Sequence, residues 1–208
     1  MNAKSKIKWI YNSKNNEELA ERYNVWAKDY DQDLVDDLEY VSPQYGVDTL
    51  SKYVSKNAKI LDAGAGTGLV GQILHQRGYH NLVGMDISEG MLDEARKKEV
   101  YTTLHQGVMG EPLGFPTAFF DAIISIGVFA DVHAPASAFD ELIRITKTKG
   151  YIIFSVLSDF YENSGFKDRL LELERTGQWK WVEIGEKFQS RSKIEADTYG
   201  QVIVYRVC

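Results

Sequence analysis

The sequence predicts an α/β fold in which a mostly parallel sheet is covered by helices on both faces. Three observations lead to this prediction. Short apolar runs, typical of buried strands, alternate with segments of helical periodicity between residues 58 and 156. The run 119–127 is almost continuously apolar, as expected of a strand buried on both faces. A glycine-rich turn joins the first apolar run to the first helical segment, an arrangement typical of ligand-binding α/β proteins.

Length and composition indicate one globular domain. The chain has 208 residues, 44% of them apolar and 26% charged, which is enough for a buried core. The net charge of −6 argues against a nucleic-acid partner, because such proteins usually carry a basic patch. The single cysteine, Cys208, allows no disulfide within the chain and suits a reducing compartment. No apolar run reaches membrane-spanning length, so we expect a cytoplasmic protein without a membrane partner.

The chain divides into a short polar tail and the domain. Residues 1–15 are lysine-rich and show no periodicity, so we expect them to be mobile. Residues 16–208 form the domain, and its first part, 16–56, is predicted to be helical. Tyr23, Trp26 and Tyr30 share one face of the first helix. This stripe is either ordinary core packing or a lid whose aromatic rings cover a cationic ligand and exclude water.

The glycine-rich turn spans residues 62–68, with Gly64, Gly66 and Gly68 at alternate positions. Lacking a Cβ atom, these residues permit positive φ and a close approach of a ligand to the backbone. A phosphate-binding loop would need Lys followed by Ser or Thr where this chain has Leu69 and Val70. A dinucleotide-binding loop would need its third glycine at position 69. The spacing instead matches the acidic-x-G-x-G-x-G loop of proteins that bind S-adenosylmethionine (SAM).

A second acidic residue follows the glycine loop at a suitable distance. Residues 81–85 predict the next strand, which ends at Asp86. A carboxylate there can accept hydrogen bonds from both ribose hydroxyls of an adenosine. The alternative is a glycine-rich surface turn with an unrelated surface aspartate. Agreement between loop and acid favours SAM binding.

The remaining segments continue the alternation. Helices are predicted from Ser42 to about Ser55 and over 69–77, 88–98 and 135–147, and strands over 100–106, 119–127 and 151–156. One amphipathic helix follows Ser158. The segments 179–184 and 200–207 then predict an antiparallel hairpin, with the polar residues 189–193 in its connection.

Two titratable residues, Asp131 and His133, lie just beyond the fourth predicted strand, at the end of the sheet where α/β proteins bind their ligands. They could act as a general-base pair for a protonated nucleophile. The alternative is that His133 simply precedes the helix start at Ala134 and Pro135, since the sequence shows no third partner. No metal site is expected.

Together, these motifs resemble those of class I SAM-dependent methyltransferases over nearly the whole chain from Tyr23 onward. Segments 23–33, 60–71 and 88–92 are more narrowly similar to the methyltransferase-like proteins named after the Williams–Beuren syndrome critical region. The resemblance implies a Rossmann-like three-layer αβα sandwich with an N-terminal helical lid. Its sheet would have seven strands in the order 3-2-1-4-5-7-6, with the last strand antiparallel. SAM is the implied cofactor and S-adenosyl-L-homocysteine the implied product.

The implied cofactor site departs from the family at one position. Many members place an aspartate near Val108 to bond the adenine amino group; here Val108 and Met109 would pack on the ring, or Glu111 would substitute. The family's Asn-Pro-Pro-Tyr-like motif for methylating amide and adenine nitrogens is absent, which disfavours that chemistry. The expected cofactor-binding residues are Tyr23, Trp26, Tyr30, Asp62, Gly64, Ala65, Gly66, Gly68, Asp86, Ile87, Met91, Val108, Met109, Ser125 and Gly127.

The predicted function is in-line transfer of a methyl group from SAM to an unidentified acceptor, with a small molecule favoured over a protein. Asp62 would lie near the ammonium group of the methionine part, and Asp86 would hold the ribose. Two alternatives stay open at this point. One is a module that binds SAM or a partner without catalysis. The other, disfavoured by the glycine spacing, is an NAD-dependent oxidoreductase.

Overall fold

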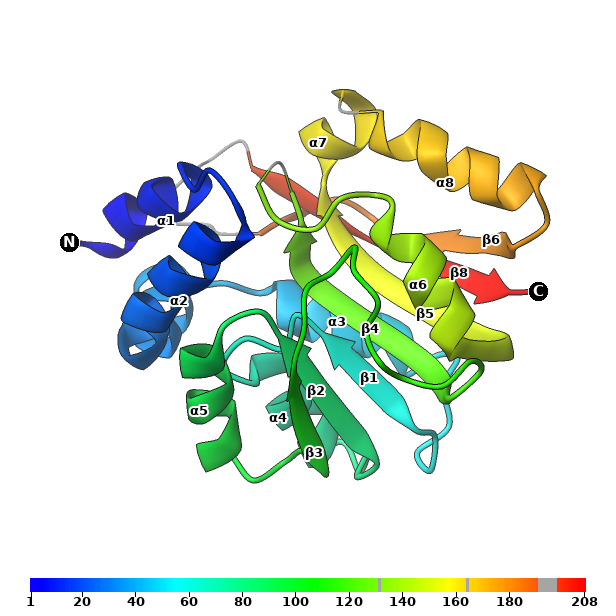
Figure 1. The fold of residues 1–208 in the computed structure, drawn as a ribbon, viewed down its shortest axis with the longest axis horizontal. Coiled ribbons are helices and arrows are strands. Elements are labelled where there is room, and N and C mark those ends of the chain that lie inside the picture. Colours follow the sequence, from blue (N-terminus) through cyan, green and yellow to red (C-terminus); the bar gives the residue numbers. More distant parts are fainter. Residues whose placement is uncertain (131, 164, 191–197) are drawn as a thin grey trace.

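The computed structural model describes residues 1–130, 132–163, 165–190 and 198–208, and its central feature is one twisted sheet (Figure 1). The strand order is β3-β2-β1-β4-β5-β8-β6, with β7 paired to β8. β1 to β5 pair in parallel, whereas β8 runs antiparallel to β5, β6 and β7. The strands are β1 (Ile60–Ala63), β2 (Leu82–Asp86), β3 (Thr103–Gln106), β4 (Phe120–Phe129), β5 (Thr146–Leu157), β6 (Trp179–Ile184), β7 (Phe188–Gln189) and β8 (Tyr199–Val207).

The predicted α/β fold and strand order are confirmed. The two-residue strand β7 makes the last strand the eighth rather than the seventh. The predicted hairpin is also present, because β6 and β8 are antiparallel neighbours. However, β8 lies between β5 and β6, so β6 and not β8 forms this edge of the sheet, and β3 forms the other. Part of the predicted polar connection, residues 191–193, lies outside the described residues.

Helices cover both faces of the sheet (Figure 1). Successive side chains of a strand point to opposite faces, so Ile60 and Ile124 pack with α3 and α4, whereas Leu61 and Ile123 pack with α6 and α8. This two-sided burial explains the continuous apolar run of β4. The helical segments are α1 (Ala3–Tyr11), α2 (Asn16–Asp31), the π-helical η1 (Gln32–Asp37), α3 (Ser42–Leu50), α4 (Leu69–Gln76), α5 (Glu89–Lys97), α6 (Ala138–Ile145), α7 (Ser158–Asn163) and α8 (Phe166–Arg175).

The first residues differ from the sequence expectation of a tail without regular structure. Residues 3–11 form α1, which begins at an Asn2 side chain that accepts a hydrogen bond from the Ser5 N–H. Ala3 and Ile10 are buried against α2 and η1, and Lys6 pairs with Asp33 at 2.7 Å. Ala3, Ile7 and Ile10 stand at i, i+4 and i+7 on the face that packs on α2 and η1, a spacing that the sequence analysis overlooked. Tertiary packing of this face stabilises so short a helix.

Two further boundaries differ from the sequence analysis. α3 ends at Leu50 and continues only as turns, several residues before the predicted end. The segment after Leu157 forms two helices instead of one, because Gly165 adopts a left-handed conformation (φ +74°) just before α8. No helix within the described ranges is long and apolar enough to cross a lipid bilayer.

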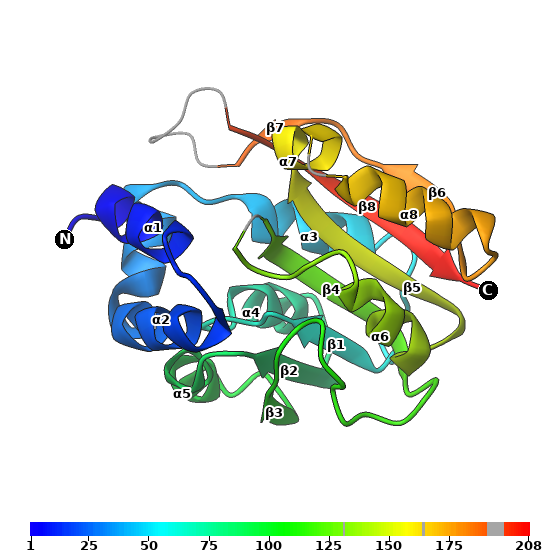
Figure 2. The same ribbon diagram turned by 45° about the horizontal axis from the view of Figure 1, so that its top comes forward.

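We call α1, α2 and η1 the cap. Figure 2 shows the cap at one end of the sheet, apart from the helices that cover the sheet faces, and β4 and β5 point toward it. The carboxyl ends of parallel strands are where α/β proteins bind ligands, because loops and helix N-termini meet there. The cap therefore lies over the end of the sheet where a ligand site is expected.

The aromatic core between the sheet and α6 should carry much of the stability. Phe139 is fully buried and contacts Phe129, Phe154, Phe166 and Trp179. The substitution Phe139→Ala should lower the free energy of unfolding in urea by about 3–5 kcal/mol, because it leaves a cavity. Leu171→Ala is the control on α8, at a residue that is 50% exposed, and it should change the same quantity by less than about 0.5 kcal/mol. Equal losses in the two variants would contradict this assignment of the core.

Candidate functional site

The glycine loop leaves β1 and turns sharply into α4. Gly64, Gly66 and Gly68 all have positive φ (81°, 55° and 90°), so the loop needs glycine at each position. A Cβ atom on Gly64 would lie 2.2 Å from the side chain of Val128, which packs over the loop. A Cβ atom on Gly66 would meet nothing within 4 Å. Gly66 therefore exposes its backbone to open space, where a ligand can approach it.

The glycine loop and the end of β2 converge, as the sequence analysis predicted. The Gly66 N–H donates to Oδ2 of Asp86 at 2.8 Å, and the Ser88 N–H donates to Oδ1 at 2.9 Å. Burial raises the pKa of Asp86, and these backbone N–H groups oppose that change. The hydrogen bonds hold the carboxylate at the mouth of the loop.

A cavity of about 670 Å³ opens between the glycine loop, the ends of β2 and β4, and the cap. We call it the cofactor cavity. The residues predicted to bind the cofactor that do line it are Tyr23, Tyr30, Gly64, Gly66, Asp86, Ile87, Met91, Val108, Met109 and Gly127. Lining residues that the sequence analysis missed are Asn16, Leu19, Met85, Gly107, Ile126, Val128 and Ala134, and His133, predicted there only as a candidate general base, also lines the cavity. Most of these lie next to predicted positions, whereas Asn16 and Leu19 come from the start of α2 and carry no motif.

Five residues predicted to bind the cofactor are not among the described lining residues of the cofactor cavity: Trp26, Asp62, Ala65, Gly68 and Ser125. Ser125 is fully buried and donates to the Ala63 carbonyl at 2.7 Å, which joins β4 to β1. Gly68 packs against Ala95 and Tyr101. Ser125 and Gly68 therefore hold the loop against β4, α5 and Tyr101. Their role in this structure is packing around the loop.

Asp62 lies beneath the glycine loop and is only 1% exposed. Its Oδ2 accepts a 2.6 Å hydrogen bond from the Tyr101 hydroxyl, and its Oδ1 has no hydrogen-bond partner. Burial raises the pKa of Asp62 to about 7, although the bond from Tyr101 acts in the opposite direction. Tyr101 fits there because residue 71 is a glycine, whose added Cβ would lie 2.3 Å from the phenol ring. The sequence shows no sign of this contact.

Two polar links fix the cap to the glycine loop and to α5. Oδ1 of Asn24 on α2 accepts hydrogen bonds from the Ser88 hydroxyl at 2.7 Å and from the Gly90 N–H at 2.8 Å. Asp31, the last residue of α2, accepts a hydrogen bond from the Thr67 hydroxyl in the loop and pairs with Lys98. The position of α2 is therefore tied to the same loop that borders the cofactor cavity.

The aromatic stripe of α2 divides between two cavities. Tyr23 and Tyr30 line the cofactor cavity. Trp26 lines a second cavity instead, and its indole N–H donates to the buried carboxylate of Asp33 at 2.6 Å. The three rings pack on one another, as the core alternative predicted, and they also form walls of the cavities. That they cover a ligand as a lid stays a prediction.

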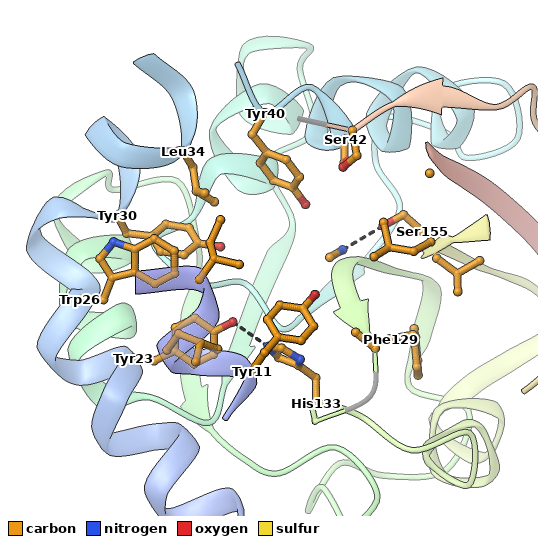
Figure 3. Close-up of a pocket in the computed structure, with 18 residues that line it drawn as sticks. Tyr11, Tyr23, Trp26, Tyr30, Leu34, Tyr40, Ser42, Phe129, His133 and Ser155 are labelled. Carbon is orange, nitrogen blue, oxygen red and sulfur yellow. Dashed lines mark hydrogen bonds between the residues drawn. The ribbon is translucent and has the colours of Figure 1, made fainter. Parts of the chain in front are cut away.

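The second cavity, also about 670 Å³, lies between the cap and the ends of β4 and β5 (Figure 3). Tyr23, Tyr30, Gly127 and His133 line both cavities, so the two spaces meet at these residues. The second cavity is walled mainly by aromatic rings and small hydroxyl side chains. Its other side chains that Figure 3 labels are Tyr11, Trp26, Leu34, Tyr40, Ser42, Phe129 and Ser155.

His133 stands where the two cavities meet. Its Nε2 lies 2.7 Å from the Tyr23 hydroxyl, and its ring packs edge-on against Tyr11 with centroids 5.3 Å apart (Figure 3). Burial raises the pKa of Tyr23 well above its ordinary value, so the phenol keeps its proton, and the tautomer of His133 decides which of the two groups donates. The other predicted member of the general-base pair, Asp131, lies outside the described residues.

The comparisons with known proteins agree with this geometry. A family model described as a methyltransferase domain matches residues 61–154, from the glycine loop to β5. Human methyltransferase-like protein 27 is 36% identical over 165 residues, which cover 76% of this chain and 66% of that protein. The chain belongs to the class I SAM-dependent methyltransferases. SAM is therefore the cofactor that this methyltransferase family assigns to the chain.

Two further matches show the range of this methyltransferase family. A bovine 18S rRNA (guanine-N(7))-methyltransferase is 46% identical over 71 residues, 34% of this chain and 25% of that protein. The solved structure of a SAM-dependent methyltransferase from Thermotoga maritima has a TM-score of 0.66 and 19% identity, and covers 89% of this chain and 98% of that one. The chain spans less than two thirds of the bovine relative and just under two thirds of the human one. The structural match concerns the fold alone.

The raised pKa of Asp62 should make the stability of the ligand-free protein depend on pH. The pKa lies above its ordinary value of 3.8, so the folded state retains a proton that the unfolded state loses. The contribution of Asp62 to stability therefore falls as the pH rises from about 4 to about 7. The substitution Asp62→Asn removes this effect. The difference to follow is the free energy of unfolding of Asp62→Asn minus that of the parent protein, both measured in urea. This difference should increase by about 2 kcal/mol between pH 5 and pH 8.

Asp121→Asn is the matched control for Asp62→Asn. The pKa of Asp121 is lowered: burial acts to raise it, but Lys147 and the Lys59 N–H outweigh burial. Its carboxyl is therefore ionised in both the folded and the unfolded state between pH 5 and pH 8. The difference between Asp121→Asn and the parent protein should stay constant over that range. A constant difference for Asp62→Asn as well would show that the pKa of Asp62 is not raised.

Proposed function

We propose that this protein transfers the methyl group of SAM to a small acceptor molecule that enters through the second cavity. The observation that carries this proposal is the junction of the two cavities at Tyr23, Tyr30, Gly127 and His133. A transferase of this kind must hold donor and acceptor in contact while excluding water, since positioning supplies much of the rate. Two neighbouring cavities that share these four lining residues beneath one cap suit that requirement.

The cofactor cavity suits the parts of SAM in sequence. The exposed backbone of Gly66 accommodates a ligand at the loop, and the fixed carboxylate of Asp86 can accept hydrogen bonds from ribose hydroxyls. Val108 and Met109 give an apolar wall for the adenine ring, whereas Glu111 is not among the described lining residues. Bound SAM supplies an already activated methyl group on a positively charged sulfur. Tyr23 and Tyr30 present aromatic faces that favour such a cation.

The size and lining of the second cavity support a small-molecule acceptor. Aromatic and aliphatic side chains make up most of its described lining, and no Lys or Arg is found among those residues. An RNA acceptor requires basic side chains that neutralise phosphates. The bovine relative is named for an rRNA acceptor, but its match covers 34% of this chain, and its acceptor is not carried over. The cytoplasm is the compartment we propose, given the single cysteine.

Asp86→Ala should weaken binding of SAM and of S-adenosylhomocysteine. Loss of the ribose acceptor should cost about 1–3 kcal/mol, which is roughly a 5- to 150-fold increase in Kd by calorimetry. Asp93→Ala on α5 is the control, because Asp93 is 60% exposed in its side chain and does not line the cofactor cavity. The control should bind both compounds as the parent does. An unchanged Kd in Asp86→Ala would remove Asp86 from the site, and no heat from the parent at millimolar ligand would refute the proposed function.

A further inference from the structure

We propose that the second cavity binds a neutral, planar acceptor that carries a phenolic hydroxyl, and that this hydroxyl faces the Tyr23–His133 pair. This inference rests on the proposed function and adds the chemical class of the acceptor. Three properties of the described lining residues support it: their aromatic surface, their lack of charge, and the hydrogen bond between Tyr23 and His133.

The walls of the second cavity suit a flat ring. Tyr11, Trp26, Tyr40 and Phe129 line it on several sides, and none of them lines the cofactor cavity. Figure 3 shows Tyr11 and Tyr40 with their hydroxyls directed into the space between the rings. The Tyr40 hydroxyl comes so close to Gly127 that a Cβ atom there would lie 2.5 Å from its oxygen. Aromatic rings favour offset and edge-to-face contact with another ring, so a planar acceptor is preferred.

The described lining residues favour a neutral acceptor over either ionic class. Within the described part of the chain, the side chains that line the second cavity include no Asp, Glu, Lys or Arg. A carboxylate acceptor would have no cation to pair with once it left water. An amine is protonated at neutral pH, so it is not nucleophilic and would place a second positive charge beside the sulfonium. A neutral hydroxyl avoids both costs.

The junction gives the hydroxyl proton a route. The Tyr23 oxygen lies 2.7 Å from His133 Nε2. In the tautomer with the ring proton on Nδ1, the Tyr23 O–H donates to Nε2, and the Tyr23 oxygen can still accept a hydrogen bond from an acceptor hydroxyl. As the acceptor oxygen bonds the methyl carbon, the carbon–sulfur bond breaks and leaves its electron pair on sulfur. The acceptor proton passes to the Tyr23 oxygen, and the Tyr23 proton passes to Nε2. Each atom and charge is then accounted for, with neutral thioether, methyl ether and an imidazolium as products.

Three naphthalene compounds that differ only in charge test the class of acceptor. The protein is first saturated with S-adenosylhomocysteine, and 2-naphthol, 2-naphthoate and 2-(aminomethyl)naphthalene are titrated by calorimetry. We expect 2-naphthol to bind at least tenfold more tightly than either ion. Tyr11→Ala should weaken 2-naphthol binding by at least fivefold, because it removes one wall of the second cavity. Tyr199→Ala is the control: Tyr199 is 44% exposed and lines neither cavity, so its affinity should match the parent.

The outcomes separate this inference from the proposed function. If S-adenosylhomocysteine binds but 2-naphthol does not, or if either ion binds more tightly, the acceptor class is wrong while the cofactor site stands. Equal loss in Tyr11→Ala and Tyr199→Ala would place naphthol outside the second cavity. If S-adenosylhomocysteine itself does not bind, the proposed function fails first.

Tyr23→Phe tests the proton route. The ring is retained, so Kd for S-adenosylhomocysteine should stay within about twofold, while methyl transfer from SAM to 2-naphthol should slow by at least tenfold. The residual rate should increase with pH about tenfold per unit, because the variant must use naphtholate formed in solution. Tyr199→Phe is the matched control outside both cavities, and it should keep the rate and the pH profile of the parent. An unchanged rate and pH profile in Tyr23→Phe would refute the relay.

Discussion

The hydrogen bond between the Gly66 N–H and the Asp86 carboxylate is the constraint on which the site depends. It joins two segments that follow neighbouring parallel strands, β1 and β2, at the same end of the sheet. The carboxylate compensates a loop N–H that the tight glycine turn leaves without a partner in the backbone. In return the loop fixes the carboxylate, although burial disfavours its charge. The floor of the cofactor cavity is therefore preorganised in the absence of ligand.

The cap depends on that floor through short polar side chains. Asp31 reaches Thr67 in the loop, and Asn24 reaches the start of α5. These links decide which way the aromatic stripe of α2 faces, and they place Tyr23 and Tyr30 above the cofactor cavity while Trp26 faces the second one. α1 then covers the second cavity through Ile7, Ile10 and Tyr11. The two cavities are thus shaped by one set of contacts.

The described lining residues of the two cavities differ in charge. Each lining matches the ligand that we propose for it. The cofactor cavity has Asp86 at its wall, and Asp62 lies beneath the loop with a pKa of about 7. A negative carboxylate at Asp86 favours a cationic cofactor. The second cavity offers hydroxyls, an imidazole and aromatic faces among its described residues. A positively charged donor next to a neutral acceptor needs no further counter-charge at the junction.

The α/β fold and the meeting of Gly66 with Asp86 were predictable from sequence, because they follow from local periodicity, glycine spacing and the rule that parallel strands end at one edge. The strand order came from the resemblance to the methyltransferase family. Ten of the fifteen predicted cofactor residues line the cofactor cavity, since motif positions lie near that edge. The helix α1 was overlooked, although Ala3, Ile7 and Ile10 have helical spacing. The burial of Asp62 under Tyr101 and the contact between Tyr23 and His133 were not predictable. Each joins residues far apart in the chain, and neither leaves a periodic pattern. Only tertiary packing brings such groups within bonding distance, and it alone decided that His133 stands between two cavities.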